Sequence, residues 1–386
     1  MSRFTKFAKK LLPRLGAIFI AAAVGIGLFA VNYFVLYTPD KNPPKPNFEF
    51  QTQPGAENNG SEEEQEIVAS NKIFNFLIMG HDRAASLTDV IMLVNYNIEM
   101  QSITIMQIPR DTYIEVDDYY YHKINGLYNY CVKNAEGEGS KQPERDGCMK
   151  MAEYLEKNLA ITIHYSAVMD LDGFGNIVDA IGGVDMYVPQ DMYYRDPTQG
   201  LVINLKKGYQ HLDGDSAEQY VRYRYGYATG DIGRGDAQKV FISAFFDKLL
   251  TSIKDANTIS ALAQNLVTYV DSDVTPADIV YFGKHFIGIG NKQGAVSLSN
   301  VKLMTMPGKA TLYNGISYYV MNKEYMSYII NEYYNIYNTS VLWSFDVKEV
   351  FVTSENSYLR DIYLDDMDNI GLTIYNAGSL EENGLN

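Results

Sequence analysis

The fold is decided by residues 72–111, which read KIFNFLIMGHDRAASLTDVIMLVNYNIEMQSITIMQIPRD. Apolar runs at 72–79, 90–95 and 102–108 are separated by polar turn residues, a pattern typical of short buried strands. The connection between the second and third runs, at 97–101, is short and polar. We therefore expect three strands, of which the last two form a β-hairpin.

Charged residues gather where these strands end. If the second strand is antiparallel to both neighbours, the end of the first strand, the start of the second and the end of the third share one edge of the sheet. Asp82, Asp89, Arg110 and Asp111 would then lie close together. Neighbouring carboxylates need a cation to neutralise them, and Mg²⁺ binds one or two carboxylates together with substrate phosphate. The edge thus indicates a metal-assisted phosphate site, unless these aspartates only cap turns.

A second charged segment holds three of the ten arginines of the chain, Arg222, Arg224 and Arg234. On a strand, Arg222 and Arg224 would point to the same face. We expect a helix from about 236 to 252, with Arg234 just before its N-terminus and Gln238 in its first turn, where free N–H groups favour an anion. Guanidinium groups bind phosphate oxygens bidentately, so the segment indicates a phosphate site. The alternative is a solvated surface on which the arginines pair with the acids Asp215, Glu218 and Asp231.

The N-terminal region predicts a membrane anchor. Residues 1–14 carry five basic side chains and no acidic one, and the 23 residues at 15–37 carry no charge. Such a run is long enough for a transmembrane helix across about 30 Å of hydrocarbon, and its basic flank should stay in the cytoplasm. A cleaved secretory signal is the alternative, but its apolar region is usually shorter and ends in a cleavage site. We expect a single-pass protein of the cell membrane with an extracellular main domain.

Composition divides the rest of the chain into three parts. Residues 38–71 hold five of the twelve prolines and a run of glutamates, which indicates an extended extracellular linker. Residues 72–338 contain the main domain, and residues 339–386 form an acidic C-terminal extension. The net charge of −15 argues against nucleic acid as a partner, because that binding depends on clustered Lys and Arg.

Two cysteines, Cys131 and Cys148, flank a polar insert. Their number and spacing match no zinc pattern. Because thiols outside the cytoplasm commonly oxidise, we expect the two to form a disulfide.

An ordered series of short motifs is similar to that of the LytR-CpsA-Psr family of membrane-anchored envelope enzymes. Each motif alone is weak, but the ordered set, spread over residues 72–250, is specific. The motifs are Gly-x-Asp (80–82), Thr-Asp-Val-Ile-Met-Leu-Val (88–94), Ile-Pro-Arg-Asp-Thr-Tyr (108–113), Lys-Ile-Asn (123–125), Asp-x-x-Gly-Phe (170–174), Ile-Gly-Gly-Val-Asp-x-x-Val-Pro (181–189), Gly-x-Gln-x-Leu-Asp-Gly (208–214), Tyr-Val-Arg-x-Arg (220–224) and Gly-Asp-x-Gly-Arg (230–234).

The resemblance implies an α/β fold with a central mixed β-sheet flanked by helices, preceded by one transmembrane helix. It implies that residues 72–338 form a catalytic domain whose apolar interior holds a polyprenyl chain. The implied reaction moves a phosphoglycosyl polymer, such as teichoic acid or capsule, from an undecaprenyl diphosphate carrier to peptidoglycan. The implied location is an envelope of the Gram-positive type.

Carried over motif by motif, the resemblance also implies roles for the polar residues. Asp82 and Asp89 would hold Mg²⁺ or Mn²⁺, and Asp111 would orient Arg110 or the acceptor. We assign catalysis to Asp82, Asp89, Arg110 and Asp111. The diphosphate would be bound by Arg83, Arg110, Lys123, Arg222, Arg224, Asp231, Arg234 and Gln238.

Two positions depart from the family pattern. Leu87 and Ala237 stand where many members have arginine, and Arg83 would replace the first of these arginines. Two other functions stay open beside the phosphotransferase. One is hydrolysis of the lipid diphosphate by water, and the other is non-catalytic binding of a lipid-linked glycan by an envelope regulator.

Overall fold

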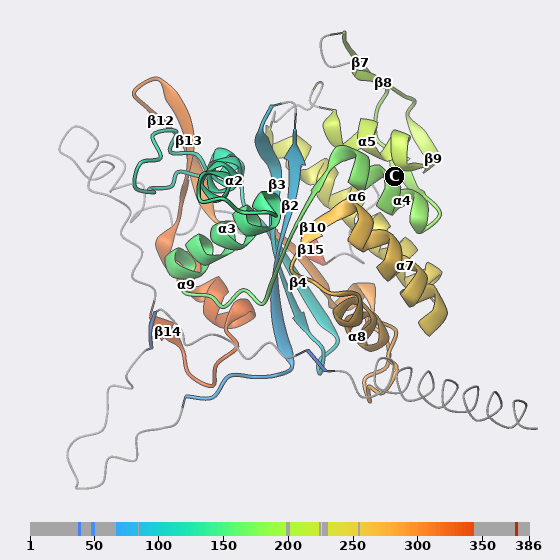
Figure 1. The fold of residues 1–386 in the computed structure, drawn as a ribbon. Helices are drawn as coiled ribbons and strands as arrows, with labels where there is room; N and C mark the ends of the chain where they lie inside the picture. The colour runs from blue at the N-terminus through green and yellow to red at the C-terminus, as the bar shows by residue number, and fades with distance from the viewer. Residues whose placement is uncertain are drawn as a thin grey trace, which may run out of the picture.

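The computed structural model describes residues 38–39, 48–50, 67–83, 85–197, 201–223, 225, 231–253, 255–342 and 375–376. A seven-stranded sheet runs through the domain, with helices on both of its faces (Figure 1). In sheet order, its strands are β10 (Val270–Ser272), β5 (Tyr165–Asp170), β2 (Ile73–Asp82), β3 (Leu87–Asn97), β4 (Ser102–Gln107), β11 (Val301–Thr305) and β15 (Tyr375–Asn376).

The three strands expected from the sequence lie at the centre of this sheet. Strand β3 pairs antiparallel with both β2 and β4, so the predicted hairpin is confirmed. Strands β5 and β11 pair parallel with β2 and β4, which makes the sheet mixed. The expected α/β fold, with a mixed sheet between helices, is therefore confirmed. Strands β2 and β3 are longer than their apolar runs because backbone pairing continues into the polar segment between them.

One face of the sheet packs against α2 (Leu127–Gly137), α3 (Pro143–Leu159) and α9 (Lys323–Ile329). Alternate residues of a strand point to the same face, and Leu77 and Met79 of β2 accordingly both enter this core, where they are fully buried. Burying an apolar side chain of this size stabilises the fold by about 1.5–3 kcal/mol. The face therefore holds these helices firmly on the sheet.

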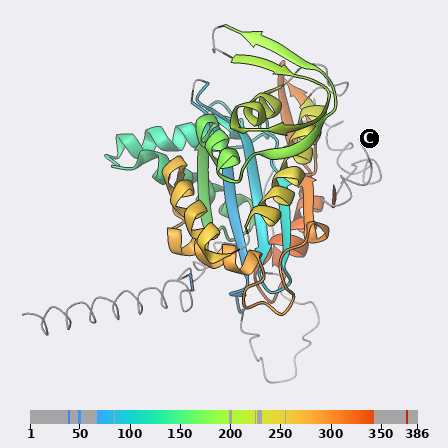
Figure 2. The same ribbon diagram turned by 90° about the vertical axis from the view of Figure 1, so that its right-hand side faces the viewer.

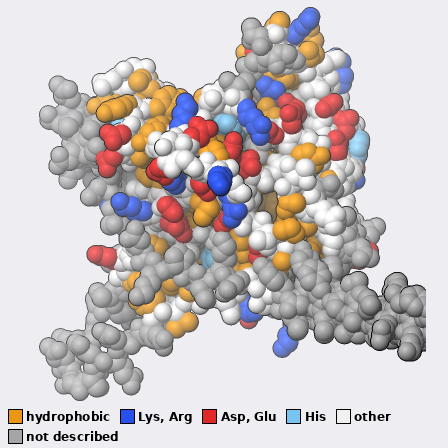
Figure 3. Space-filling view, viewed as in Figure 1, with side chains coloured by type: hydrophobic (Ala, Val, Ile, Leu, Met, Phe, Trp, Pro, Cys, Tyr) orange, Lys and Arg blue, Asp and Glu red, His pale blue; other side chains and the backbone are white. Residues whose placement is uncertain are grey.

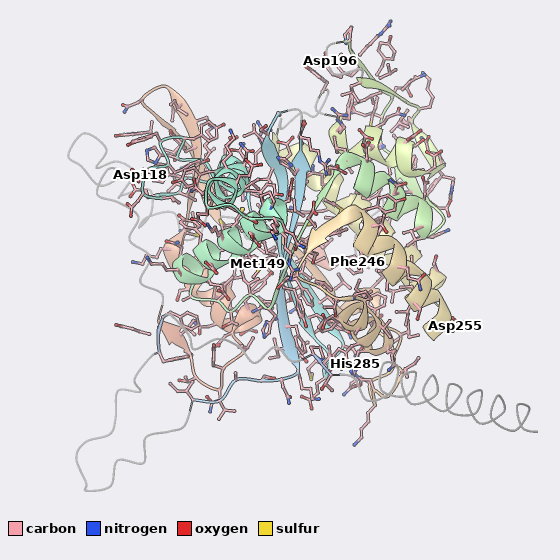
Figure 4. The ribbon with its side chains drawn as sticks, in the orientation of Figure 1. Asp118, Met149, Asp196, Phe246, Asp255 and His285 are labelled. Carbon is pink, nitrogen blue, oxygen red and sulfur yellow. The ribbon has the colours of Figure 1, made fainter. Side chains whose placement is uncertain are left out.

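The opposite face packs against α6 (Asp231–Ser252) and α8 (Pro276–Phe286). The rings of Phe74 on β2 and Phe282 on α8 lie 4.9 Å apart between centroids. Phe246 of α6 packs against the same core, and the helices of this side lie in front of the sheet when the molecule is turned (Figures 2 and 4). Helix α7 (Ala256–Tyr269) packs on α8.

A smaller apolar core lies beyond the end of the sheet, where α4 (Leu171–Ala180) and α5 (Gly214–Arg222) pack with α6. Two antiparallel strand pairs complete this lobe, and one of them projects away from the domain with Asp196 at the end of β7 (Figure 4). The paired strands are β6 (Val184–Val188) with β9 (Gly208–Leu212), and β7 (Met192–Asp196) with β8 (Leu201–Leu205).

Two further strand pairs involve the second half of the chain. The hairpin of β12 (Gly308–Tyr313) and β13 (Ile316–Met321) lies beside the segment after β4, through a bridge between Thr112 and Tyr319. Strand β1 (Glu49–Phe50), from the expected linker, pairs with β14 (Val341–Leu342), from the expected C-terminal extension. The two regions that flank the main domain in sequence thus meet each other.

The expected cytoplasmic segment at 1–14 and the expected transmembrane helix at 15–37 lie outside the described residues. Within the described part, no helix is long and apolar enough to cross a membrane.

Candidate functional site

The sheet edge at the ends of β2 and β4 brings Asp89 and Arg110 together, as the strand order predicts. The register between β2 and β3 shifts after Gly80, which leaves Asp89 in a β-bulge near the start of β3. Arg110 follows the end of β4, and its Nη1 donates to Asp89 Oδ1 over 2.5 Å. A charge-assisted hydrogen bond of this kind is stronger than one between neutral groups. It joins the start of one strand to the end of its neighbour.

Lys123 extends this ion pair. Its Nζ donates to Asp111 Oδ1 over 2.8 Å, and Asp111 Oδ2 lies 3.8 Å from Arg110 Nε. A bridge between Tyr113 and Lys123 fixes the segment before α2 beside the segment after β4. We call Asp89, Arg110, Asp111 and Lys123 the edge cluster. Their side chains are between 15% and 27% exposed, so their charges are partly shielded from water.

Asn125, the last residue of the Lys-Ile-Asn motif, is buried against the edge cluster. Its backbone N–H donates to the Arg110 carbonyl, and its own carbonyl accepts from the Thr88 hydroxyl. Its side-chain amide is buried and has no hydrogen-bond partner among the described residues. Because a buried amide without a partner is costly and rare in proteins, we expect a water or a ligand group to bind it.

Asp82 and Arg83 each make a contact outside the edge cluster. Asp82 Oδ1 accepts from the backbone N–H of Ala85 over 3.1 Å, which is the turn contact that the structural alternative predicted. Arg83 Nε lies 2.8 Å from Asp170 Oδ2 at the end of β5, and its side chain is 71% exposed. The ion pair of Arg83 is therefore with β5 and not with the edge cluster. Its expected role in diphosphate binding stays a prediction.

Gln238 reaches the same edge from the other face of the sheet. Gln107, the last residue of β4, donates from Nε2 to Gln238 Oε1 on α6 over 2.9 Å. Gln238 was predicted from the sequence as a site residue, but Gln107 was not. Gln107 lies within the apolar run at 102–108, where nothing in the sequence distinguishes it as a site residue. The pair links α6 to the strand that leads into Arg110.

The arginine-rich segment differs from the expectation in two ways. Arg222 ends helix α5 and does not lie on a strand, so the strand geometry considered for Arg222 and Arg224 is wrong. Arg222 Nη1 donates to Glu218 Oε1 over 2.8 Å, one of the acid contacts that the alternative named. Helix α6 begins at Asp231, so Arg234 lies in its first turn and not before it, and Gln238 lies beyond the first turn in which it was expected. Arg224 lies outside the described residues.

Asp82 and Asp89 could bind a magnesium ion only as two of its ligands, with water and substrate supplying the rest. Among the described residues, no group of three or more His, Cys, Asp and Glu side chains could hold a metal. Mg²⁺, however, keeps several waters and usually takes only one or two carboxylates together with substrate phosphate. Asp82 and Asp89, at the end of β2 and near the start of the paired strand β3, match that donor set.

The two cysteines are separate thiols in the core between α2 and α3, so the expected disulfide is not formed in this structure. Burial raises the pKa of Cys131 to about 11 and that of Cys148 to about 12. Both groups therefore stay protonated and unreactive at neutral pH.

The fold and the edge cluster define a mixed α/β domain with a charged site at one sheet edge. Acidic and basic side chains are also mixed over the front of the molecule, between α2 and α4 (Figure 3). The model of the LytR_cpsA_psr family matches residues 47–334. Because this match covers most of the chain, the chain belongs to that family.

Some relatives of this chain are named as regulatory proteins and others as transferases. The regulatory protein MsrR of Staphylococcus aureus is 29% identical over 240 residues, which are 61% of this chain and 64% of MsrR. The alignment thus spans just under two thirds of that relative. The polyisoprenyl-teichoic acid–peptidoglycan teichoic acid transferase TagU of Oceanobacillus iheyensis is 26% identical over 264 residues, which are 67% of this chain and 74% of TagU.

Solved structures show the same fold. Bacillus subtilis TagV matches 67% of this chain and 94% of its own chain, with a TM-score of 0.51 and 23% identity. The protein gbs0355 of Streptococcus agalactiae matches 71% of this chain and 93% of its own, with a TM-score of 0.52 and 18% identity. The expected family fold is therefore confirmed.

Proposed function

We propose that this protein is a membrane-anchored extracytoplasmic phosphotransferase. It moves a phosphoglycosyl polymer, such as teichoic acid or capsule, from an undecaprenyl diphosphate carrier to peptidoglycan. The observation that carries the proposal is the edge cluster, in which Arg110 and Lys123 lie in a chain of ion pairs at the end of β4. Membership of a family in which TagU is named a teichoic acid transferase supports it.

The edge cluster suits the binding of a diphosphate. A guanidinium carries five N–H donors in a rigid fork, so Arg110 can keep its bond to Asp89 while it donates to phosphate oxygens. Asp89 holds the fork in one orientation, and Asp111 does the same for the ammonium of Lys123. Gln238 lies at the same edge and adds a neutral amide. We include Arg222, Arg224 and Arg234 in the diphosphate site on the family motif alone.

The reaction needs positioning and neutralisation of charge more than a protein nucleophile. The oxygen of an acceptor hydroxyl on peptidoglycan forms a bond to the phosphorus that carries the glycan. The bond from that phosphorus to the bridging oxygen breaks, undecaprenyl phosphate leaves, and the hydroxyl proton passes to solvent or a nearby base. Arg110 and Lys123 stabilise the negative charge that develops on the phosphate oxygens. Bound Mg²⁺ or Mn²⁺, held by Asp82 and Asp89, would neutralise the same charge.

The direct test uses the full chain in lipid nanodiscs, with a synthetic polyprenyl-diphosphate glycan, a peptidoglycan oligomer and Mg²⁺. We expect a covalent glycan–peptidoglycan product from the wild type and none from Arg110→Ala or Asp89→Ala. The control is Arg145→Ala, which removes an exposed arginine of α3 outside the edge cluster and should leave product formation unchanged.

The same assay separates the alternatives. Release of glycan phosphate without a peptidoglycan product would identify a hydrolase. Binding of the lipid-linked glycan with no chemical change would identify a binding or regulatory protein, the kind of role that the name of MsrR suggests. Either result, obtained with several glycans, would overturn the transferase proposal.

A further inference from the structure

A pocket of about 240 Å³ opens beside Asp82, on the α2 and α3 side of the sheet. Its wall combines His81 at the end of β2 and Arg83 just after it with Asn129 from α2 and Glu144 from α3. Asp170 at the end of β5 and Asp271 on β10 complete the polar part of the wall. The pocket is therefore built from five elements that meet at the same sheet edge as the edge cluster.

Fixed contacts hold this wall in place. Asp170 Oδ1 accepts from the backbone N–H of Gly173 and caps α4, while its Oδ2 lies 2.8 Å from Arg83 Nε. The His81 ring packs edge-on against the ring of Tyr128, with 5.0 Å between centroids. His81 Nε2 is buried and has no hydrogen-bond partner among the described residues. The wall thus presents a polar atom for which the described residues supply no partner.

The charge of the pocket is opposite to that expected of a phosphate site. Three carboxylates line it, from Glu144, Asp170 and Asp271, against one guanidinium, from Arg83. Such a wall repels the phosphate groups of the donor. It favours a ligand that donates hydrogen bonds, since ionised carboxylates only accept them.

The volume of the pocket also limits the kind of ligand that it can hold. A volume of about 240 Å³ corresponds to roughly eight water molecules at about 30 Å³ each. It lies below the range of about 300–1,000 Å³ that is usual for pockets enclosing larger ligands. The space inside the pocket therefore suits a single sugar ring, and any further part of a ligand would extend outside it.

We propose that this pocket binds one sugar ring of the acceptor glycan through the ring's hydroxyl groups. The carboxylates of Asp170, Asp271 and Glu144 accept from the hydroxyls, and Asn129 and His81 bind the remaining polar atoms. The proposal rests on the proposed function, because it assigns the negative pocket to the acceptor and the positive edge cluster to the donor. His81 and Arg83 are the chain neighbours of Asp82, so the pocket opens at the same end of β2 as this expected Mg²⁺ ligand.

The test measures binding without turnover. The full chain in detergent is titrated by calorimetry with a GlcNAc–MurNAc disaccharide whose lactyl carboxylate is blocked as an amide, and separately with geranylgeranyl diphosphate plus Mg²⁺. We expect Asp271→Asn to weaken binding of the disaccharide about tenfold, as for a lost charged hydrogen bond, and Asn129→Ala to weaken it about fivefold, as for a lost neutral one. Binding of the diphosphate should stay within about twofold, because neither residue belongs to the edge cluster. Glu153→Gln on α3 is a matched control outside the pocket and should change neither affinity.

Three outcomes would overturn the assignment: no binding of the disaccharide to the wild type, unchanged binding in both variants, or equal weakening of the diphosphate. Thermal unfolding of each variant shows whether a loss of binding reflects misfolding. Disaccharide binding that depends on Asp271 and Asn129, in a protein that forms no transfer product, would support the pocket and refute the transferase.

Discussion

Gln107 at the end of β4 donates a hydrogen bond to Gln238 on α6 over 2.9 Å, and so joins the two halves of the candidate site. One half is the edge cluster, which lies near the start of β3, after the end of β4 and before α2. The other half is the start of α6, which carries Asp231 and Arg234 in its first turn. The position of the second half relative to the first thus depends in part on a neutral side chain.

Replacement of Gln107 by alanine should weaken donor binding and leave catalysis largely intact. The variant loses the contact that holds Gln238, and one neutral hydrogen bond contributes about 1 kcal/mol, or about a fivefold change in KM for the lipid donor. Steady-state kinetics with the lipid-linked glycan measure this. Gln264→Ala, on the exposed side of α7, is the control and should have wild-type kinetics. A KM equal to that of the wild type in Gln107→Ala would show that Gln238 needs no such support.

Conversion of Asp89 to asparagine should lower kcat by about 100-fold or more, because it removes the charge that orients Arg110 and that would hold Mg²⁺. Asparagine keeps an oxygen that can accept from Arg110 Nη1, so the effect on stability should be only about 1 kcal/mol. Chemical denaturation and turnover are measured on the same preparation. A variant that loses several kcal/mol of stability together with activity would contradict a catalytic role and favour a structural one.

Lys123→Met keeps the length of the side chain and removes its charge. Asp111 then keeps only the longer contact to Arg110, so we expect it to draw Arg110 away from Asp89 and to lower kcat/KM about tenfold or more. Lys150→Met is the matched control, because Lys150 pairs with Glu138 on the surface of α2 and α3. Equal effects of the two substitutions would show that the ion pair of Lys123 has no special role.

The stability of the protein should fall as the pH drops below 6.5, in part because of His285 (Figure 4). Burial, reinforced by the charges of Lys72 and Lys284, lowers the pKa of His285 from its usual 6.5. Between the lowered value and 6.5, the unfolded chain binds a proton that the folded protein does not, so the free energy of unfolding rises with pH in that window. Urea denaturation at pH 7.5 and at pH 5.5 measures the difference.

His285→Gln should reduce that difference, because glutamine does not titrate. A general loss of packing against Tyr281 lowers stability at both pH values and does not affect the comparison. If the variant and the wild type lose the same stability between the two pH values, His285 does not contribute to the pH dependence.

The central sheet was predictable because its signals are local. The apolar runs of β2, β3 and β4 follow one another within 35 residues, and their order placed Asp89 and Arg110 at one edge. The helix at 214–222 was missed, although Asp213 supplies a cap: its Oδ1 accepts from the Ser216 N–H over 2.9 Å. The alternation of tyrosine and arginine at 220–224 suggested a strand, but the cap and the apolar face of the helix determine the local structure.

Other features could not be read from neighbouring residues. Gln107 meets Gln238 across 131 positions in the chain, and Arg83 meets Asp170 only because β5 pairs parallel with β2. Both contacts depend on strand pairings that join distant segments. The pocket beside Asp82 has the same origin, since its wall combines strands and helices from residues 81 to 271.

The sheet order also has a consequence for the time course of folding. Pairings within β2, β3 and β4 close only short loops, whereas β4 with β11 joins segments about two hundred residues apart. Since long loops are slower to close, we expect the edge cluster around Asp89 and Arg110 to form early and the contact of Gln107 with Gln238 to form late. A newly made chain would then carry one half of the candidate site before the other, and the site would be complete only in the last stage of folding.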